Sequence, residues 1–138
     1  EQGKGRLPHD HNRDYTPPVL LYPETRAFTD LFQVPGAEPQ YFVDFHNPLS
    51  GGSYHDRPFA YCPGALKNGR AWKRFLELTG YPGKDSYSSE TATSWFAKNV
   101  KGAELSVSLE TPYALDPDEA RRLGARLADI LIEIASER

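Results

Sequence analysis

The sequence contains no methionine, not even at its first position, and only one cysteine, Cys62, among 138 residues. A chain that does not begin with methionine is expected to be a processed or excerpted piece, so the lack of a leader segment carries no weight. A single cysteine excludes an internal disulfide framework and leaves the compartment undecided. No apolar run approaches the roughly eighteen residues that a transmembrane helix needs, so we expect no membrane partner.

The sequence also lacks an excess of charge of either sign. Sixteen Lys and Arg against nineteen Asp and Glu give a net charge of −3. Without a basic stripe, a nucleic-acid partner has no electrostatic support. The hydrophobic content of 38% suits one globular domain with a single core, which we expect to span residues 1–138. Proline (12) and glycine (11) are abundant, and loop-rich domains often carry their function on the loops.

Hydrophobic periodicity predicts helices that alternate with strands, which is typical of an α/β fold. Strands are expected over 41–46, near 59–61 and within 103–113. The apolar residues of 41–46 point both ways, which predicts an inner strand buried on both faces. Helices are expected over 23–33, 69–81, about 91–99, and from the capping signal of Asp116-Pro117-Asp118-Glu119 to the end of the chain.

Polar residues stand at three places that suit a site: Asn12-Arg13 in the first loop, His46 at the end of one strand, and Glu110 near the end of another. In open α/β sheets, ligands bind at the carboxyl ends of strands. Each also has an ordinary structural interpretation. His46 could be a hydrogen-bonded structural histidine, Glu110 could cap a turn, and Asn12-Arg13-Asp14 could be a salt-bridged loop.

Four segments, in order, resemble the later motifs of the zinc carboxypeptidases, the carboxypeptidase A-like metallopeptidases. They are "DHNRDY" (10–15), "YFVDFHNP" (41–48), "SYSSETATSWF" (86–96) and "LSVSLETPY" (105–113), and "YPETRAF" resembles the family's helix start between the first two. The resemblance covers nearly the whole chain. It implies an open, mixed, mainly parallel sheet flanked by helices, of which this chain would be the C-terminal portion, and a zinc-dependent hydrolase that removes a C-terminal residue from a peptide.

Transferred position by position, the resemblance implies a role for each polar cluster. His46 would be a zinc ligand, and Asp44 would support it from behind. Asn12 and Arg13 would bind the free carboxylate of a peptide or small amide substrate. Glu110 would be the general base on zinc-bound water.

Three further residues follow from the same resemblance. Tyr87 would be the tyrosine that closes over the substrate, and Thr93 would lie near the position that selects the terminal side chain. Arg6 is the candidate for the transition-state arginine. Bacterial relatives of this kind are secreted, which favours an extracytoplasmic setting.

The chain departs from the family in one respect: it has no His-x-x-Glu pair to supply the first two zinc ligands. A catalytic zinc ion needs three protein ligands. We therefore expect an N-terminal segment of the same protein to supply the other two, and the isolated chain to be inactive. Three alternatives stay open: a non-catalytic carboxylate- or peptide-binding module, a related amide deacylase, and a separate metal site formed by His9, His11, His46 and His55.

Overall fold

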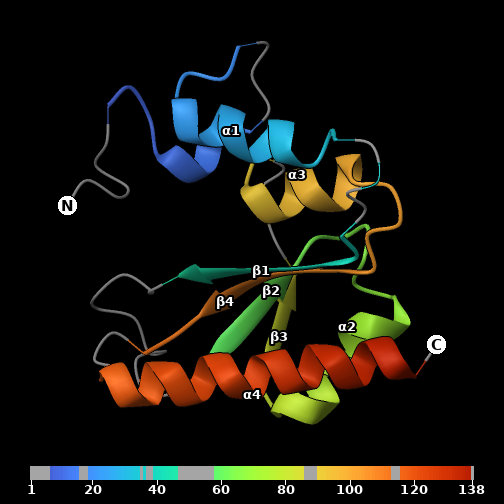
Figure 1. Cartoon of the computed structure of the whole chain (residues 1–138). Helices are drawn as coiled ribbons and strands as arrows, with labels where there is room; N and C mark the ends of the chain where they lie inside the picture. Colours follow the sequence, from blue (N-terminus) through green and yellow to red (C-terminus); the bar gives the residue numbers. More distant parts are fainter. Residues whose placement is uncertain are drawn as a thin grey trace.

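The computed structural model describes residues 7–15, 19–34, 36, 39–46, 58–85, 90–112 and 116–137. These residues form four strands and four α-helices after a short 3-10 turn (Figure 1). In chain order they are η2 (His11–Arg13), α1 (Pro23–Leu31), β1 (Tyr41–His46), β2 (Phe59–Cys62), α2 (Arg70–Thr79), β3 (Gly83–Asp85), α3 (Ala92–Asn99), β4 (Leu105–Glu110) and α4 (Pro117–Ser136).

The strands form one open, mixed sheet in the order β1-β4-β2-β3. β1 runs parallel to β4 and β2 runs parallel to β3, while β2 and β4 are antiparallel. Helices α1 and α3 cover one face of the sheet, and α2 and α4 cover the other (Figure 1). The expectation of an α/β fold with a mixed sheet flanked by helices is therefore confirmed. The carboxypeptidase-like identity of that fold remains a prediction.

One sequence prediction about the sheet is wrong. Among the described residues, β1 lies at an end of the sheet and has β4 as its strand neighbour, whereas its apolar pattern predicted an inner strand. The pattern arises because β1 lies between two helical layers. Phe42 packs against α1 and α3, and Val43 packs against the core on the opposite side. Phe45 keeps 54% of its surface exposed, as an edge position permits.

The main hydrophobic core lies between the sheet and the pair α2 and α4. It is built from the apolar faces of β2, β4, α2 and α4, and its largest fully buried members are Phe75, Leu105, Leu109 and Ile134. Cys62 is also fully buried there, and burial, with a smaller effect of Asp85, raises the pKa of its thiol to about 12. A thiol in that state is not a nucleophile at neutral pH.

The other face of the sheet is packed differently. Towards β1 it carries an aromatic cluster, in which Phe42 stacks on Phe96 at 5.1 Å and contacts Phe28 at 5.3 Å between ring centroids. Towards β4 it carries buried hydroxyl groups from Ser106 and Ser108. The polar end of this face is where the predicted site residues lie.

Candidate functional site

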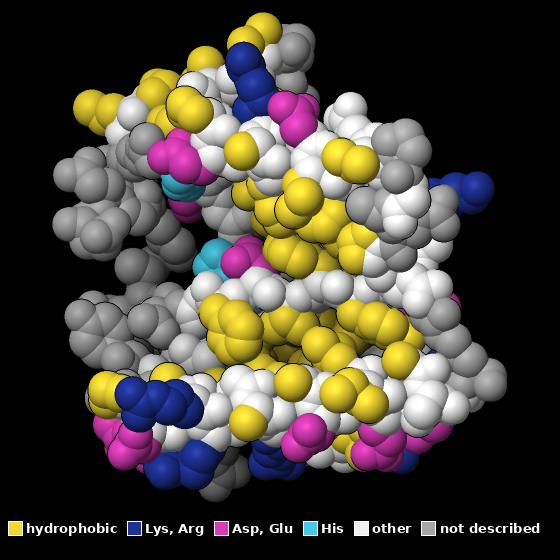
Figure 2. Space-filling view, in the orientation of Figure 1, with side chains coloured by type: hydrophobic (Ala, Val, Ile, Leu, Met, Phe, Trp, Pro, Cys, Tyr) yellow, Lys and Arg dark blue, Asp and Glu magenta, His cyan; other side chains and the backbone are white. Residues whose placement is uncertain are grey.

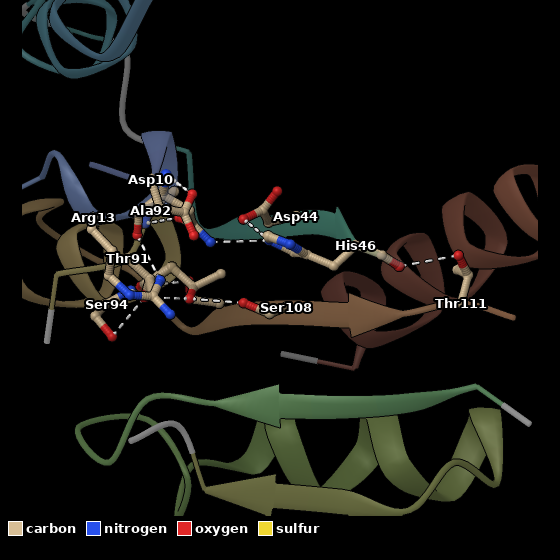
Figure 3. A network of polar contacts seen from close by, with 12 residues as sticks. Asp10, Arg13, Asp44, His46, Thr91, Ala92, Ser94, Ser108 and Thr111 are labelled. Atoms are coloured by element: carbon tan, nitrogen blue, oxygen red, sulfur yellow. Dashed lines mark hydrogen bonds and ion pairs between the residues drawn. The ribbon is translucent and has the colours of Figure 1, made fainter. Parts of the chain in front are cut away.

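His46 and Glu110 lie side by side at the carboxyl ends of two neighbouring parallel strands. They are register partners in the β1–β4 pair, although 64 positions separate them in sequence. Partners in a parallel pair point to the same face, and adjacent strands lie roughly 5 Å apart. The backbone carbonyl of His46 accepts hydrogen bonds from the Thr111 amide at 2.8 Å and hydroxyl at 3.1 Å, which secures the end of β1 against β4 (Figure 3).

The Asp44 carboxylate forms a short hydrogen bond with one nitrogen of the His46 ring. The two residues share a face of β1, and Asp44 Oδ2 lies 2.7 Å from His46 Nε2 (Figure 3). An ionised carboxylate can only accept, so this short contact requires the hydrogen to be on Nε2. In the neutral ring, Nδ1 then carries the lone pair. Asp44 therefore sets which nitrogen of His46 can accept a proton or bind a metal ion.

Asn12 connects this pair to helix α3. Its side-chain oxygen accepts a hydrogen bond of 2.9 Å from the Ala92 amide in the first turn of the helix. That bond turns the amide nitrogen towards His46, with Nδ2 at 3.2 Å from Nε2. Because Nε2 already donates to Asp44 and the Asn12 amide nitrogen is also a donor, this contact is not a second hydrogen bond, and it limits the rotation of the ring only by its close approach. Asn12 thus supports the imidazole in addition to any contact with substrate.

Asp14, which is completely buried, fixes the loop that carries Asn12 and Arg13. Its carboxylate accepts from the Thr25 hydroxyl at 2.5 Å, from the amides of Tyr22 at 2.9 Å and Leu21 at 3.0 Å, and from His9 Nε2 at 3.1 Å. Burial alone would raise the pKa of this carboxyl group, but these hydrogen bonds outweigh burial and lower the pKa to about 2. The sequence interpretation had treated Asp14 only as a possible salt-bridge partner within its loop.

Arg13 lies near Thr91 and away from His46 in the close view (Figure 3). It is half-buried, and its Nη1 donates to the Asn12 carbonyl at 2.8 Å. This bond ties one end of the guanidinium to the η2 turn. A planar guanidinium has five N–H donors, so the group retains capacity to bind a carboxylate.

A pocket of about 400 Å³ opens beside Asp44 and His46. The pocket is lined by the first two residues of η2, by Tyr15, by three residues of α1, by the last five residues of β1 and by Ala92. Burial first, and then the nearby Asp44 and Asp14 charges, raise the pKa of Tyr15 to about 12, so its hydroxyl stays protonated at neutral pH. Tyr15 and the aromatic wall of Phe28 and Phe42 were not predicted as site residues. The adjacency of Tyr15 to the "DHNRD" segment was the only available signal.

The remaining predicted site residues are placed differently. Thr93 is fully buried, lies 3.1 Å from the Ser108 hydroxyl and does not line the pocket. Neither Arg13 nor Glu110 belongs to the pocket lining. One carboxylate oxygen of Glu110, Oε2, is buried. Arg6 and Tyr87 lie outside the described residues, so their predicted roles remain predictions.

The described residues do not by themselves form a complete metal site. Within them, no three His, Cys, Asp or Glu side chains are grouped closely enough to hold an ion. His9 and His11 pack edge-on against Tyr22, at 5.5 and 4.6 Å between ring centroids. This arrangement gives no support to a site made of the four histidines, of which His55 lies outside the described residues. A zinc ion therefore does not fit this part of the chain without further ligands.

Comparison with models of protein families, with curated proteins and with solved structures found no match to the chain. Among the helices that the structure describes, none is long and apolar enough to cross a membrane.

Proposed function

We propose that this chain is the part of a zinc carboxypeptidase-like hydrolase that supplies one metal ligand, the general base and the group that binds the substrate carboxylate. His46, Glu110 and Arg13 would have these three roles. The substrate would be a peptide or small amide with a free carboxylate. The observation that carries the proposal is the register pairing of His46 with Glu110 at the carboxyl ends of β1 and β4, with Asp44 bonded to the imidazole.

The geometry supports a separate role for each of Asp44, His46 and Glu110. Asp44 keeps the hydrogen on Nε2 of His46, which leaves Nδ1 as the ligand atom. Glu110, the register partner of His46 on the neighbouring strand, would take a proton from water and return it to the leaving amine. Because the described residues supply one ligand of the three that a catalytic zinc requires, we derive no step through the metal itself.

Zinc binding to the isolated chain tests whether the metal site is incomplete. We expect a Kd weaker than about 10 µM by isothermal titration calorimetry, because the binding free energy of about 10 kcal/mol or more at complete sites comes from a full set of ligands. His46→Ala should abolish the residual binding, while the double variant His9→Ala/His11→Ala should leave it unchanged. One stoichiometric site with submicromolar affinity would contradict the need for ligands from elsewhere.

The role of Arg13 is tested in the protein that includes the upstream segment. We expect Arg13→Ala to lower kcat/KM about 10- to 100-fold for substrates with a free terminal carboxylate. This is the loss of rate that corresponds to the free energy of one charge-assisted hydrogen bond. Amidated substrates should be almost unaffected. Arg26→Ala is a matched control, because Arg26 is exposed, donates to the Leu20 carbonyl and does not line the pocket. An equal loss for both substrate types would show that Arg13 does not bind the carboxylate.

A non-catalytic binding module is the second candidate. The observation that favours it is the lack of a grouped set of metal ligands among the described residues. Such a module would bind a carboxylate-containing peptide through Arg13 without zinc. Peptide binding that is unchanged by a chelator, together with no hydrolysis by the longer protein, would favour the module over the hydrolase.

A further inference from the structure

Buried hydroxyl groups join the first turn of α3 to β4. Thr93 is completely buried, and Thr91, Ser106 and Ser108 are each at most 8% exposed. Thr93 bonds to β4 twice. Its carbonyl accepts from the Ser106 hydroxyl at 2.8 Å, and its own hydroxyl lies 3.1 Å from the Ser108 hydroxyl (Figure 3). Since an unpaired buried hydroxyl is costly, these contacts hold the helix turn and the strand in one arrangement.

The hydroxyl hydrogens of this cluster point in one direction. Thr91 donates its single hydroxyl hydrogen to Ser94 at 3.0 Å. The Thr93 hydroxyl, which lies 3.1 Å from that of Thr91, must then be the donor to Thr91. Ser108 must in turn be the donor to Thr93. Thr93 therefore both donates and accepts, and removal of its hydroxyl breaks both bonds.

The same turn of α3 is bonded to the loop that carries Arg13. The Ala92 amide, next to Thr93 in the chain, donates to the Asn12 side chain at 2.9 Å. The Asn12 carbonyl accepts from Arg13 Nη1 at 2.8 Å. A continuous path of covalent and hydrogen bonds thus connects the Arg13 guanidinium to Thr93 and, through Thr93, to β4.

We propose that Thr93 is a positioning residue of the site, an inference that rests on the roles proposed above for Arg13 and Glu110. Ser108, its partner on β4, lies two residues before Glu110 on the same face of that strand. The Thr93 hydroxyl fixes α3 against β4, and α3 in turn fixes Arg13 at a set distance from Glu110. A binding group displaced by about 1 Å can lower a rate about 100-fold, so such support has a functional effect.

Thr93 acts in this way without touching substrate. It is fully buried and is not part of the pocket lining. The sequence resemblance had instead placed Thr93 near the position that selects the terminal side chain of a substrate. The two roles differ in their requirement: a positioning role needs the hydroxyl, whatever side chain the ligand carries.

Titration of the 138-residue chain with N-acetylglycine, followed by nuclear magnetic resonance, tests the positioning role without zinc or hydrolysis. This probe is a small amide with one free carboxylate and no side chain. We expect Thr93→Val, which keeps the shape but lacks the hydroxyl, to raise the Kd at least about fivefold. Thr93→Ser retains the hydroxyl and should stay within about twofold of the unmodified chain.

Thr79→Val is the matched control for lost stability. Thr79 is also buried (7%), and its hydroxyl donates to the Phe75 carbonyl at 2.7 Å near the end of α2, on the opposite face of the sheet (Figure 1). Both valine variants should lose about 3 to 6 °C in Tm, because each loses a buried hydroxyl contact. The Kd for N-acetylglycine should be unchanged in Thr79→Val.

The outcomes separate this inference from the function on which it rests. A Kd that rises in Thr93→Val and recovers in Thr93→Ser supports the positioning role. An unchanged Kd in Thr93→Val, or an equal rise in Thr79→Val, overturns that role, and a weaker Arg13→Ala would still leave Arg13 as the carboxylate-binding residue. No binding by the unmodified chain, or an unchanged Kd in Arg13→Ala, overturns both.

Discussion

In the zinc-dependent hydrolase that we propose, with its upstream segment present, replacing Glu110 with glutamine is expected to lower turnover by at least about 100-fold. Glutamine has nearly the same shape as glutamate, but its amide cannot take a proton from water or return one to the leaving amine. Glu110 lies beside His46 at the ends of parallel strands, the place where a base would meet a water near that imidazole. The measurement is kcat on a small peptide substrate, together with zinc content.

The control must separate lost chemistry from lost structure, because Oε2 of Glu110 is buried. Glu104→Gln makes the same chemical change just before β4, where the carboxylate accepts from the Tyr41 hydroxyl at 3.4 Å. It should leave turnover within about twofold, and both variants should retain zinc and the melting temperature. If the Glu110→Gln protein folds, binds zinc and has the original turnover, Glu110 is not the general base.

Replacing Asp14 with asparagine is expected to give the largest loss of stability, about 3 kcal/mol, or roughly 10 °C in Tm. The buried carboxylate accepts four hydrogen bonds, which come from the His9 ring, the backbone amides of Leu21 and Tyr22, and the Thr25 hydroxyl. The amide of asparagine has only one oxygen to accept hydrogen bonds. Its NH₂ group takes the place of the second carboxylate oxygen and therefore opposes the donors that had bonded to that oxygen. Denaturant unfolding measures the effect, and Asp30→Asn, at an exposed position on the same helix α1, is the matched control.

The pH dependence of stability gives an independent check on Asp14. Its pKa is about 2 in the folded protein and near the ordinary value of 3.8 in the unfolded chain, so its contribution to stability is present above about pH 4 and is lost as the pH falls towards 2. The unmodified protein should therefore lose stability over this window more steeply than Asp14→Asn. Equal slopes for the two proteins would contradict the low pKa.

Elements set by local signals were predictable. The strand at 41–46 has the predicted bounds, α1 begins at Pro23, and Asp116 forms the predicted capping box of α4. The α2 helix ends where Gly80 adopts a positive φ of 68° and donates its amide to Leu76. These features depend on residues within one or two turns of each other, so they can be read from a short window.

Elements that depend on distant residues were not predictable in the same way. The three residues of β3, Gly83–Asp85, show no strand pattern and become a strand because β2 lies beside them. Thr93 was expected near the substrate, but the structure buries it against Ser108 of β4. Asp14 has partners up to eleven positions away, and nothing in its own neighbourhood indicates that it is buried.

The amino-acid order alone determined the four α-helices, the strands at β1, β2 and β4, and the polar side chains at their ends, because backbone propensity and capping act over a few residues. Only the folded arrangement decided that β1 lies at an edge of the sheet formed by the described residues, that His46 pairs in register with Glu110, and that Asn12 and Asp44 both approach the same imidazole nitrogen. Those outcomes depend on how strands order and register within the sheet. That order is set by the packing of the two helical layers, and no short stretch of sequence contains it.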